Sequence, residues 1–293
     1  MRRWRKLAGR FLPRSLKNLI ARWGHGFRPS QVPVPFYITE SPFGLMAEFF
    51  AGARVRITPT EPEHLYAALK VGEAVEELSA FAHMARAHDL LFDVGAHTGA
   101  FSLIFCASGP RKRAVAYEPS NALANVAIGL AELNEVADRL TVCPVAIGGR
   151  SGELPAFLGP TGFVHVGISM GAIPAVWVKT VTLDDECDRL GQFPGLVKID
   201  VEGYEYEVLC GARRLLNIAR PVLFLELHLD ILEQRGTSPE DLCTLLANHG
   251  YRLYDLVGRA VPFVSVMRTI KGIMRVIAQP VSLAAPEVRE YRS

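Results

Sequence analysis

Charged side chains alternate along Leu196-Val-Lys-Ile-Asp-Val-Glu202, a segment that otherwise has the continuous apolar character of a buried strand. Lys198, Asp200 and Glu202 fall at every second position, so a strand would place all three on one face. Charges on a buried strand are costly unless they are paired or take part in chemistry. We interpret this face as a catalytic site; the alternative is that Lys198 bridges the two acids and ties the turn together.

A second apolar segment ends in Glu226-Leu-His228, which again places two polar groups on one face. Imidazole and carboxylate groups are the common general bases of enzymes. We therefore expect His228 or Asp200 to act as a base, with Glu226 beside them and with Lys198 and Glu202 orienting them. His97 is the weaker acid–base candidate.

The same three side chains, Asp200, Glu226 and His228, offer the oxygen and imidazole ligands that Mg²⁺, Mn²⁺ or Zn²⁺ accept. Nothing in their spacing demands a metal, and none is predicted.

A glycine-containing turn, Asp93-Val-Gly-Ala-His-Thr-Gly99, follows another apolar segment. Gly95 allows a tight turn and close backbone approach, and Gly99 lets a following helix pack near the strand. The middle glycine that a dinucleotide pyrophosphate needs is absent. Asp93 suits an ammonium group, and the helix start suits a carboxylate. S-adenosylmethionine (SAM) carries both charges on a nucleoside, so we expect SAM here, in contact with Ala96 and Thr98 as well.

An acidic residue, Glu118, closes the next apolar segment and is followed by Pro119. A carboxylate at this place can accept hydrogen bonds from both hydroxyls of a ribose, as the acidic residue of dinucleotide folds does. We expect Glu118 to hold the SAM ribose and Pro119 to contact SAM beside it; the alternative for Glu118 is an ordinary surface acid at a strand end.

The elements that position these residues alternate between short apolar strands and helical segments. This rhythm predicts an α/β fold with a parallel sheet covered on both faces. The predicted strands are 89–95, 113–118, 140–147, 196–201, 221–227 and 251–256, and the predicted helices are 71–86, 100–108, 119–133, 205–216 and 238–249.

Four regions divide the chain. We expect a basic amphipathic extension and linker over 1–44, a preamble or cap over 45–88, the site-bearing domain over 89–257 and a C-terminal extension over 258–293. A β excursion over 148–188 interrupts the domain. Residues 1–24 place apolar side chains at helical intervals with basic residues between them. This extension either rests on anionic lipid, packs on the domain as a helix, or is a poorly ordered tail.

Composition excludes several classes of protein. The 293 residues are 49% hydrophobic and 21% charged, which is unlike a disordered chain. Nine of the 32 Lys and Arg lie in residues 1–39, where no acid occurs, so the remainder sets 23 basic against 30 acidic groups. That balance disfavours nucleic-acid binding.

Five widely spaced cysteines without a C-x-x-C motif fit a reducing compartment. The uncharged stretch 159–178 contains Pro160, Pro174 and several glycines, which indicates turns and strands rather than a membrane helix. We expect a cytoplasmic protein, with peripheral membrane contact through residues 1–24 as the open alternative.

Taken in order, several motifs resemble the FkbM family of SAM-dependent methyltransferases over about residues 75–257. They are Phe92-Asp-Val-Gly-Ala-His-Thr-Gly-Ala-Phe-Ser102, Thr182-Leu-Asp184, Val197-Lys-Ile-Asp-Val-Glu-Gly-Tyr-Glu205, Val208-Leu-Cys-Gly-Ala212 and Pro221 to His228.

The resemblance implies a seven-stranded, mostly parallel Rossmann-like class I methyltransferase sheet, SAM as donor, and O-methylation of a sugar, glycan or natural-product hydroxyl. By position, Asp93, Gly95 and Gly99 would hold the methionine portion, Glu118 the ribose and Ala146 the adenine. His97-Thr98 stands where many members have Asn-Ile, so local contacts to SAM would differ.

Two alternatives remain. One is a non-catalytic SAM- or nucleotide-binding module at a membrane surface or partner, which a cleft plugged by Trp177 or Phe163 would favour. The other is a nicotinamide-dependent oxidoreductase, which the absent middle glycine weakens. The acceptor, the oligomeric state and the identity of the base stay open. Aromatic residues such as Phe163, Trp177, Tyr204 and Tyr206 are weak candidates for stacking on a sugar.

Overall fold

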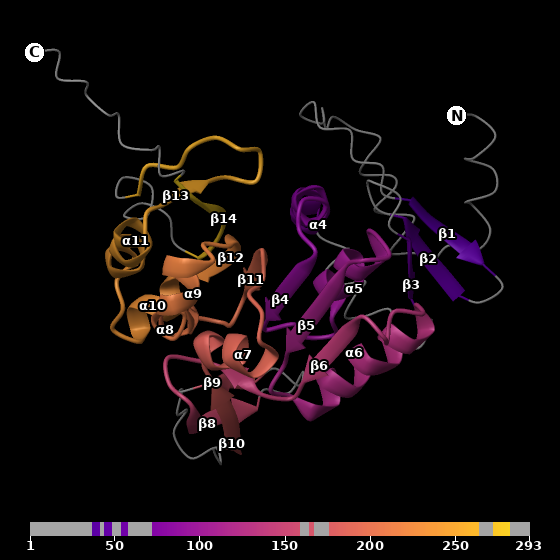
Figure 1. Cartoon of the computed structure of the whole chain (residues 1–293), viewed down its shortest axis with the longest axis horizontal. Helices are drawn as coiled ribbons and strands as arrows, with labels where there is room; N and C mark the ends of the chain where they lie inside the picture. Colours follow the sequence, from indigo (N-terminus) through magenta and orange to yellow (C-terminus); the bar gives the residue numbers. More distant parts are fainter. Residues whose placement is uncertain are drawn as a thin grey trace, which may run out of the picture. The chain divides into compact units, whose positions relative to one another are not determined.

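A computed structural model describes residues 37–41, 44–48, 54–57, 72–158, 164–166, 176–263 and 272–281. Its main element is a seven-stranded sheet in the order β13-β14-β12-β11-β4-β5-β6 (Figure 1). The strands are β4 (Leu90–Val94), β5 (Arg113–Tyr117), β6 (Leu140–Cys143), β11 (Leu196–Ile199), β12 (Val222–His228), β13 (Tyr251–Tyr254) and β14 (Ile273–Pro280).

The five strands from β12 to β6 are parallel, and β14 pairs antiparallel with both β12 and β13. The predicted mostly parallel, seven-stranded class I sheet is thereby confirmed. The strand order reverses beside β4, whose neighbours are β5 and β11. In an open α/β sheet this switch point, at the carboxyl ends of the strands, is where ligands bind.

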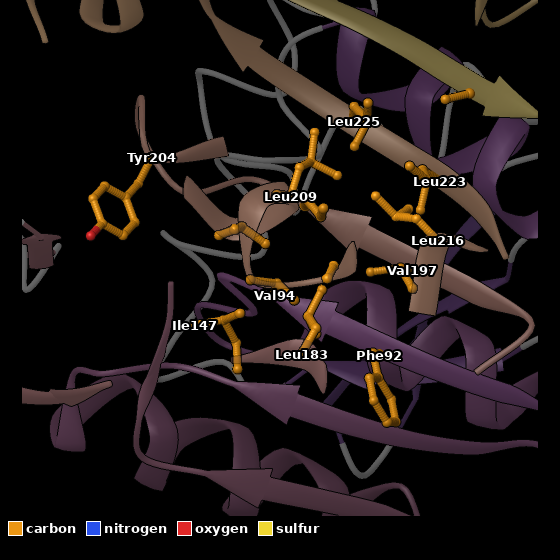
Figure 2. Close-up of a cluster of buried hydrophobic side chains, with 14 of the residues drawn as sticks. Phe92, Val94, Ile147, Leu183, Val197, Tyr204, Leu209, Leu216, Leu223 and Leu225 are labelled. Carbon is orange, nitrogen blue, oxygen red and sulfur yellow. The ribbon is translucent and has the colours of Figure 1, made fainter. Parts of the chain in front are cut away.

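Helices cover both faces of the sheet, because alternate residues of each strand point to opposite faces. They are α4 (Gly72–Ala85), α5 (Ala100–Ala107), α6 (Asn121–Leu133), α7 (Leu183–Leu190), α8 (Glu205–Cys210), α9 (Arg213–Ile218), α10 (Leu229–Gln234) and α11 (Pro239–Asn248). Leu91 and Phe224 belong to the core that α4, α5 and α6 share. Figure 2 shows the opposite core, where Phe92, Val94 and Leu225 lie with Leu209 of α8 and Leu216 of α9.

Local sequence sets several helix starts. The Ser238 hydroxyl accepts from the Asp241 amide at 3.1 Å, and the Asp241 carboxylate accepts from the Ser238 amide at 3.0 Å, which forms a capping box before α11. Thr182 caps α7 in the simpler way, with its hydroxyl accepting from the Asp185 amide at 3.0 Å.

The predicted β excursion is a four-stranded sheet in the order β7-β10-β8-β9. Its strands are β7 (Ala146–Ile147), β8 (Gly152–Leu158), β9 (Val164–Val166) and β10 (Val176–Val181). A separate antiparallel sheet consists of β1 (Tyr37–Ser41), β2 (Gly44–Glu48) and β3 (Arg54–Ile57).

Two predicted elements are each divided. The expected strand 140–147 ends at Cys143 because Pro144 has no amide to donate, and Ala146 and Ile147 pair with β10 in the second sheet instead. The expected helix 205–216 breaks at Gly211, where a side-chain Cβ would lie 2.2 Å from the Gly148 carbonyl oxygen. This close approach requires glycine.

Two segments lie inside the main fold although we placed them in flanking regions. Helix α4 packs on the sheet through Leu78, Phe81 and Ala82. Strand β14 lies between β12 and β13, so the seventh strand comes from the segment predicted as a C-terminal extension. Its Arg275 interrupts the apolar pattern, which concealed the strand in the sequence.

The amphipathic segment 1–24 and the linker up to residue 36 lie outside the described residues. Within the described ranges, no helix has both the length and the apolar character needed to cross a membrane.

Replacing Ile277 with Ala should lower the free energy of unfolding by about 2–4 kcal/mol, because Ile277 is 6% exposed in the core beneath α4. Ile273→Ala is the matched control, since Ile273 lies on the same strand and is 51% exposed. We expect it to cost less than about 1 kcal/mol. Urea unfolding of the full chain measures both, and equal small effects would contradict the placement of β14.

Candidate functional site

The turn after β4 touches the end of β11. Gly95 has φ +73°, and a Cβ there would lie 1.8 Å from the Asp200 carbonyl oxygen. The amides of Gly95 and Ala96 both donate to the Tyr117 carbonyl oxygen at 3.0 Å. The sequence therefore needs glycine at 95, because three strand ends converge on that residue.

Asp93 lies beneath this turn and is fully buried. Its Oδ2 accepts from the Ser102 amide at 3.1 Å and from the Ser102 hydroxyl at 2.7 Å. Burial raises the pKa of Asp93, although Lys198 and the bonds from Ser102 act in the opposite direction. Asp93 thus accepts from the Ser102 amide at the start of α5, where we expected a ligand carboxylate to bind.

Glu118 lies at the end of β5 and is buried. Its Oε2 accepts from the His97 amide at 2.9 Å, and its Oε1 accepts from the Ser120 amide at 2.8 Å. Burial raises the pKa of Glu118 in spite of both bonds. The two amides fix the carboxylate at the mouth of the glycine turn, and each oxygen keeps a lone pair for a further donor.

A pocket opens at this switch point between β4 and β11. It is lined by Gly95, His97, Tyr117, Glu118, Pro119, Ala146, Ile147, Asp200, Val201, Glu202 and Tyr204. Of the residues expected to contact SAM, Gly95, Glu118, Pro119 and Ala146 line it. Asp93, Ala96, Thr98 and Gly99 do not; they lie beneath or within the turn.

Sequence reasoning missed five lining residues as cofactor contacts: His97, Tyr117, Ile147, Val201 and Tyr204. Four of them adjoin a residue that we did predict, so chain adjacency was the available signal. Tyr204 lies two residues beyond Glu202 and reaches the pocket because Glu202 and Gly203 both have positive φ, 53° and 89°. That reversal of the chain could not be read from the sequence.

Lys198 is the buried cation of the site. Its Nζ donates to the Gly95 carbonyl oxygen at 3.1 Å and to Asp200 Oδ2 at 3.2 Å, and it lies 3.8 Å from Asp93 Oδ1. Burial by itself lowers the pKa of Lys198, but Asp200, Asp93 and other carboxylates outweigh burial and raise it. Lys198 therefore stays charged and joins the strand ends, as the bridging interpretation of the sequence described.

His228 is 6% exposed and is surrounded by acids. Its Nδ1 lies 3.1 Å from Glu205 Oε1, and its Nε2 lies 3.3 Å from Glu202 Oε2 and 3.8 Å from Glu226 Oε1. Burial alone lowers the pKa of His228, but the Glu205 bond and the charges of Glu202 and Asp200 raise it to about 9. An imidazolium cannot accept a proton, so this geometry favours a carboxylate as the base at neutral pH.

Glu226 lies behind the pocket rather than in its lining. Its Oε2 accepts from Arg275 Nε on β14 at 2.8 Å, and the same nitrogen lies 2.9 Å from Glu77 Oε2 on α4. Burial followed by the charge of Glu226 raises the pKa of Glu77 to about 7. Asp200 and Glu202 are the two predicted catalytic residues that line the pocket, and Lys198, Glu226 and His228 support them.

The pocket-lining part of the chain matches a known protein family. A family model described as "Methyltransferase FkbM domain" matches residues 93–253, more than half of the chain. The chain belongs to the FkbM family of methyltransferases. The match begins at Asp93 and extends beyond His228, so it includes every residue that lines the pocket.

Known proteins are similar to parts of this FkbM chain. It is 29% identical over 164 residues to the hexuronic acid methyltransferase AglP of Haloferax volcanii, across 54% of this chain and 62% of that protein. The chain thus spans less than two thirds of that relative.

Two solved structures are also similar. The methyltransferase FkbM from Methylobacillus flagellatus KT is 18% identical with TM-score 0.41, covering 65% of this chain and 43% of that one. The O-methyltransferase from Bacillus cereus in complex with SAH is 10% identical with TM-score 0.42, covering 94% of each chain.

The pKa of His228 should be close to 9 in buffer that contains EDTA, and Glu205→Gln should lower it because the substitution removes the bonded carboxylate. Titration of the imidazole ¹⁵N signals measures both values. Glu233→Gln on exposed α10 is the control and should leave the pKa unchanged.

The raised pKa of His228 makes the stability of the protein depend on pH. The folded pKa lies above the ordinary 6.5, so the stabilisation is complete below pH 6.5 and is lost as the pH rises through about 9. We therefore compare the free energy of unfolding of the wild type with that of His228→Gln at each pH. The advantage of the wild type should decrease by up to about 3 kcal/mol as the pH rises across this window. A flat difference would show that His228 is not an imidazolium.

Proposed function

We propose that this protein transfers the methyl group of SAM to a hydroxyl oxygen of a sugar, glycan or natural-product acceptor. One observation carries the proposal: the pocket places Glu118 on one side of the glycine turn, and Asp200 and Glu202 on the other side. The carboxylate proposed for the ribose and the two proposed bases thus share one opening, in a chain of a methyltransferase family.

The donor half of the pocket suits a nucleoside joined to an amino acid. Glu118 is fixed by two amides and can accept from ribose hydroxyls. Ala146 and Ile147 offer an apolar wall for adenine, and Gly95 lets the methionine portion approach the backbone. Asp93 would act through the turn that it supports.

When bound, SAM supplies a methyl group already activated on a sulfonium. The chain's residues then have to position the acceptor, exclude water and receive one proton. When the acceptor oxygen takes the methyl group from the sulfonium, which would leave as the neutral thioether, a carboxylate of the chain would receive the hydroxyl proton. We assign that carboxylate to Asp200 or Glu202, because both line the pocket and His228 is already protonated.

A sugar acceptor is favoured by the similarity to a hexuronic acid methyltransferase. The non-catalytic alternative loses support, because Trp177 is 67% exposed and does not line the pocket. Phe163, its other proposed plug, lies outside the described residues. Cytoplasmic location and membrane contact through residues 1–24 remain predictions.

Glu118→Gln should weaken SAM binding about 10- to 100-fold, because it removes a charge-assisted acceptor for the ribose hydroxyls. Isothermal titration with SAM and with its demethylated product measures the affinity. Glu132→Gln on the exposed side of α6 should leave it unchanged. An affinity within about twofold of wild type would contradict the ribose assignment.

Asp200→Asn and Glu202→Gln separate chemistry from donor binding. The variant that lacks the base should lose about 10²- to 10⁴-fold in kcat, while SAM affinity stays within a few fold. Transfer of labelled methyl from SAM to uronic-acid and neutral glycans supplies the assay. Full activity in both variants would exclude a carboxylate base at these positions.

A further inference from the structure

We propose that Asp200, Glu226 and His228 form a binding site for a divalent cation of the Mg²⁺ or Mn²⁺ class. Each residue offers one ligand atom, a carboxylate oxygen or an imidazole nitrogen, and these atoms all lie within 4.8 Å of one another. Oxygen-rich sites with one imidazole suit Mg²⁺ and Mn²⁺, and the ligands come from the ends of the neighbouring strands β11 and β12.

Both carboxylates keep one oxygen for such an ion. Asp200 Oδ2 accepts from Lys198 Nζ at 3.2 Å, and Glu226 Oε2 accepts from Arg275 Nε at 2.8 Å. The hydrogen bonds among the described residues leave Asp200 Oδ1 and Glu226 Oε1 without a donor. Hydrogen bonds to the far oxygen of a ligating carboxylate are typical of metal sites, because they fix the orientation of the ligand.

His228 provides a second, independent indication. Its Nδ1 is held by Glu205 Oε1 at 3.1 Å, and Glu205 is 0% exposed. Glu205 is fixed in turn by the Gly203 amide, which donates to the same oxygen at 3.0 Å. A buried carboxylate on one ring nitrogen is how proteins orient a histidine whose other nitrogen binds a metal. Here that other nitrogen, Nε2, lies 3.3 Å from Glu202 and 3.8 Å from Glu226.

Acidic side chains surround the three ligands. Within the described residues, six acidic side chains near the ligands form ion pairs with Lys198, Arg275 or His228. The acids are Glu77, Asp93, Asp200, Glu202, Glu205 and Glu226. Buried carboxylates without compensation are costly, so extra positive charge is favourable at their centre.

The location gives the ion a role that rests on the proposed function. Asp200 lines the pocket, so an ion on its free oxygen would meet the acceptor hydroxyl there. Coordination lowers the pKa of a hydroxyl and so makes it a better nucleophile. Asp200 would then be a ligand, and Glu202, which also lines the pocket, would receive the hydroxyl proton.

Titration of the full chain with Mn²⁺ tests the site without donor or acceptor. The protein is first treated with EDTA and desalted. Binding of Mn²⁺ should then reduce the six-line EPR signal of the free ion, with a stoichiometry of one ion per chain. Asp200→Asn and Glu226→Gln should each weaken this binding about tenfold or more. Asp230→Asn is the matched control, because Asp230 is exposed two residues beyond His228, and it should bind as the wild type does.

Variants that fail to fold, as judged by circular dichroism, are replaced by a measurement on the wild type. Mn²⁺ should broaden the imidazole ¹⁵N signal of His228 before those of the other histidines. An unchanged EPR signal at millimolar Mn²⁺, wild-type affinity in Asp200→Asn, or broadening that starts at another histidine would each overturn the proposal. Failure of SAM to bind would contradict the proposed methyl-transfer function. The Mn²⁺ titration would still test the cation site, because it contains neither donor nor acceptor.

Discussion

The buried Lys198 ammonium is the interaction on which the site depends. It joins the Gly95 carbonyl oxygen, Asp200 and Asp93, and so connects the ends of β4 and β11 at the point where the strand order reverses. Removing a cation from water costs several kcal/mol, which only paired carboxylates and a carbonyl can offset. The Phe101 ring, 5.0 Å from Nζ, adds a cation–π contact. Lys198 thus ties the turn after β4 to the end of β11.

That arrangement determines which groups face the pocket. Asp93 accepts hydrogen bonds from the Ser102 amide and hydroxyl and lies beneath the turn. Glu118 accepts from two backbone amides and lies at the pocket opening. Across the turn, the positive φ of Glu202 brings its carboxylate to the lining and to His228. Glu118 after β5 and the pair Asp200 and Glu202 after β11 therefore lie on opposite sides of Gly95, which has no side chain to separate them.

The acidic surroundings of His228 favour a positive charge at this position. Glu205, Glu202 and Asp200 favour a positive charge on the imidazole more than burial opposes it. The same carboxylates would favour a metal ion in place of the proton. In either state the Nε2 lone pair of His228 is occupied, which is the reason for proposing a pocket-lining carboxylate as the base.

The sequence by itself determined the parallel sheet, the glycine turn, the acid after β5 and the charged face of β11, because strand periodicity and strand-end chemistry are local properties. Contacts across strands were decided only by the tertiary structure. Asp93 lies beneath the turn because its carboxylate accepts a hydrogen bond from Ser102. Ala146 pairs with β10 outside the main sheet because β6 ends before Pro144. Strand β14 completes the sheet and brings Arg275 to Glu226, a pairing 49 residues apart in sequence. No local pattern encodes such a partner, since its energy exists only after both strands are packed.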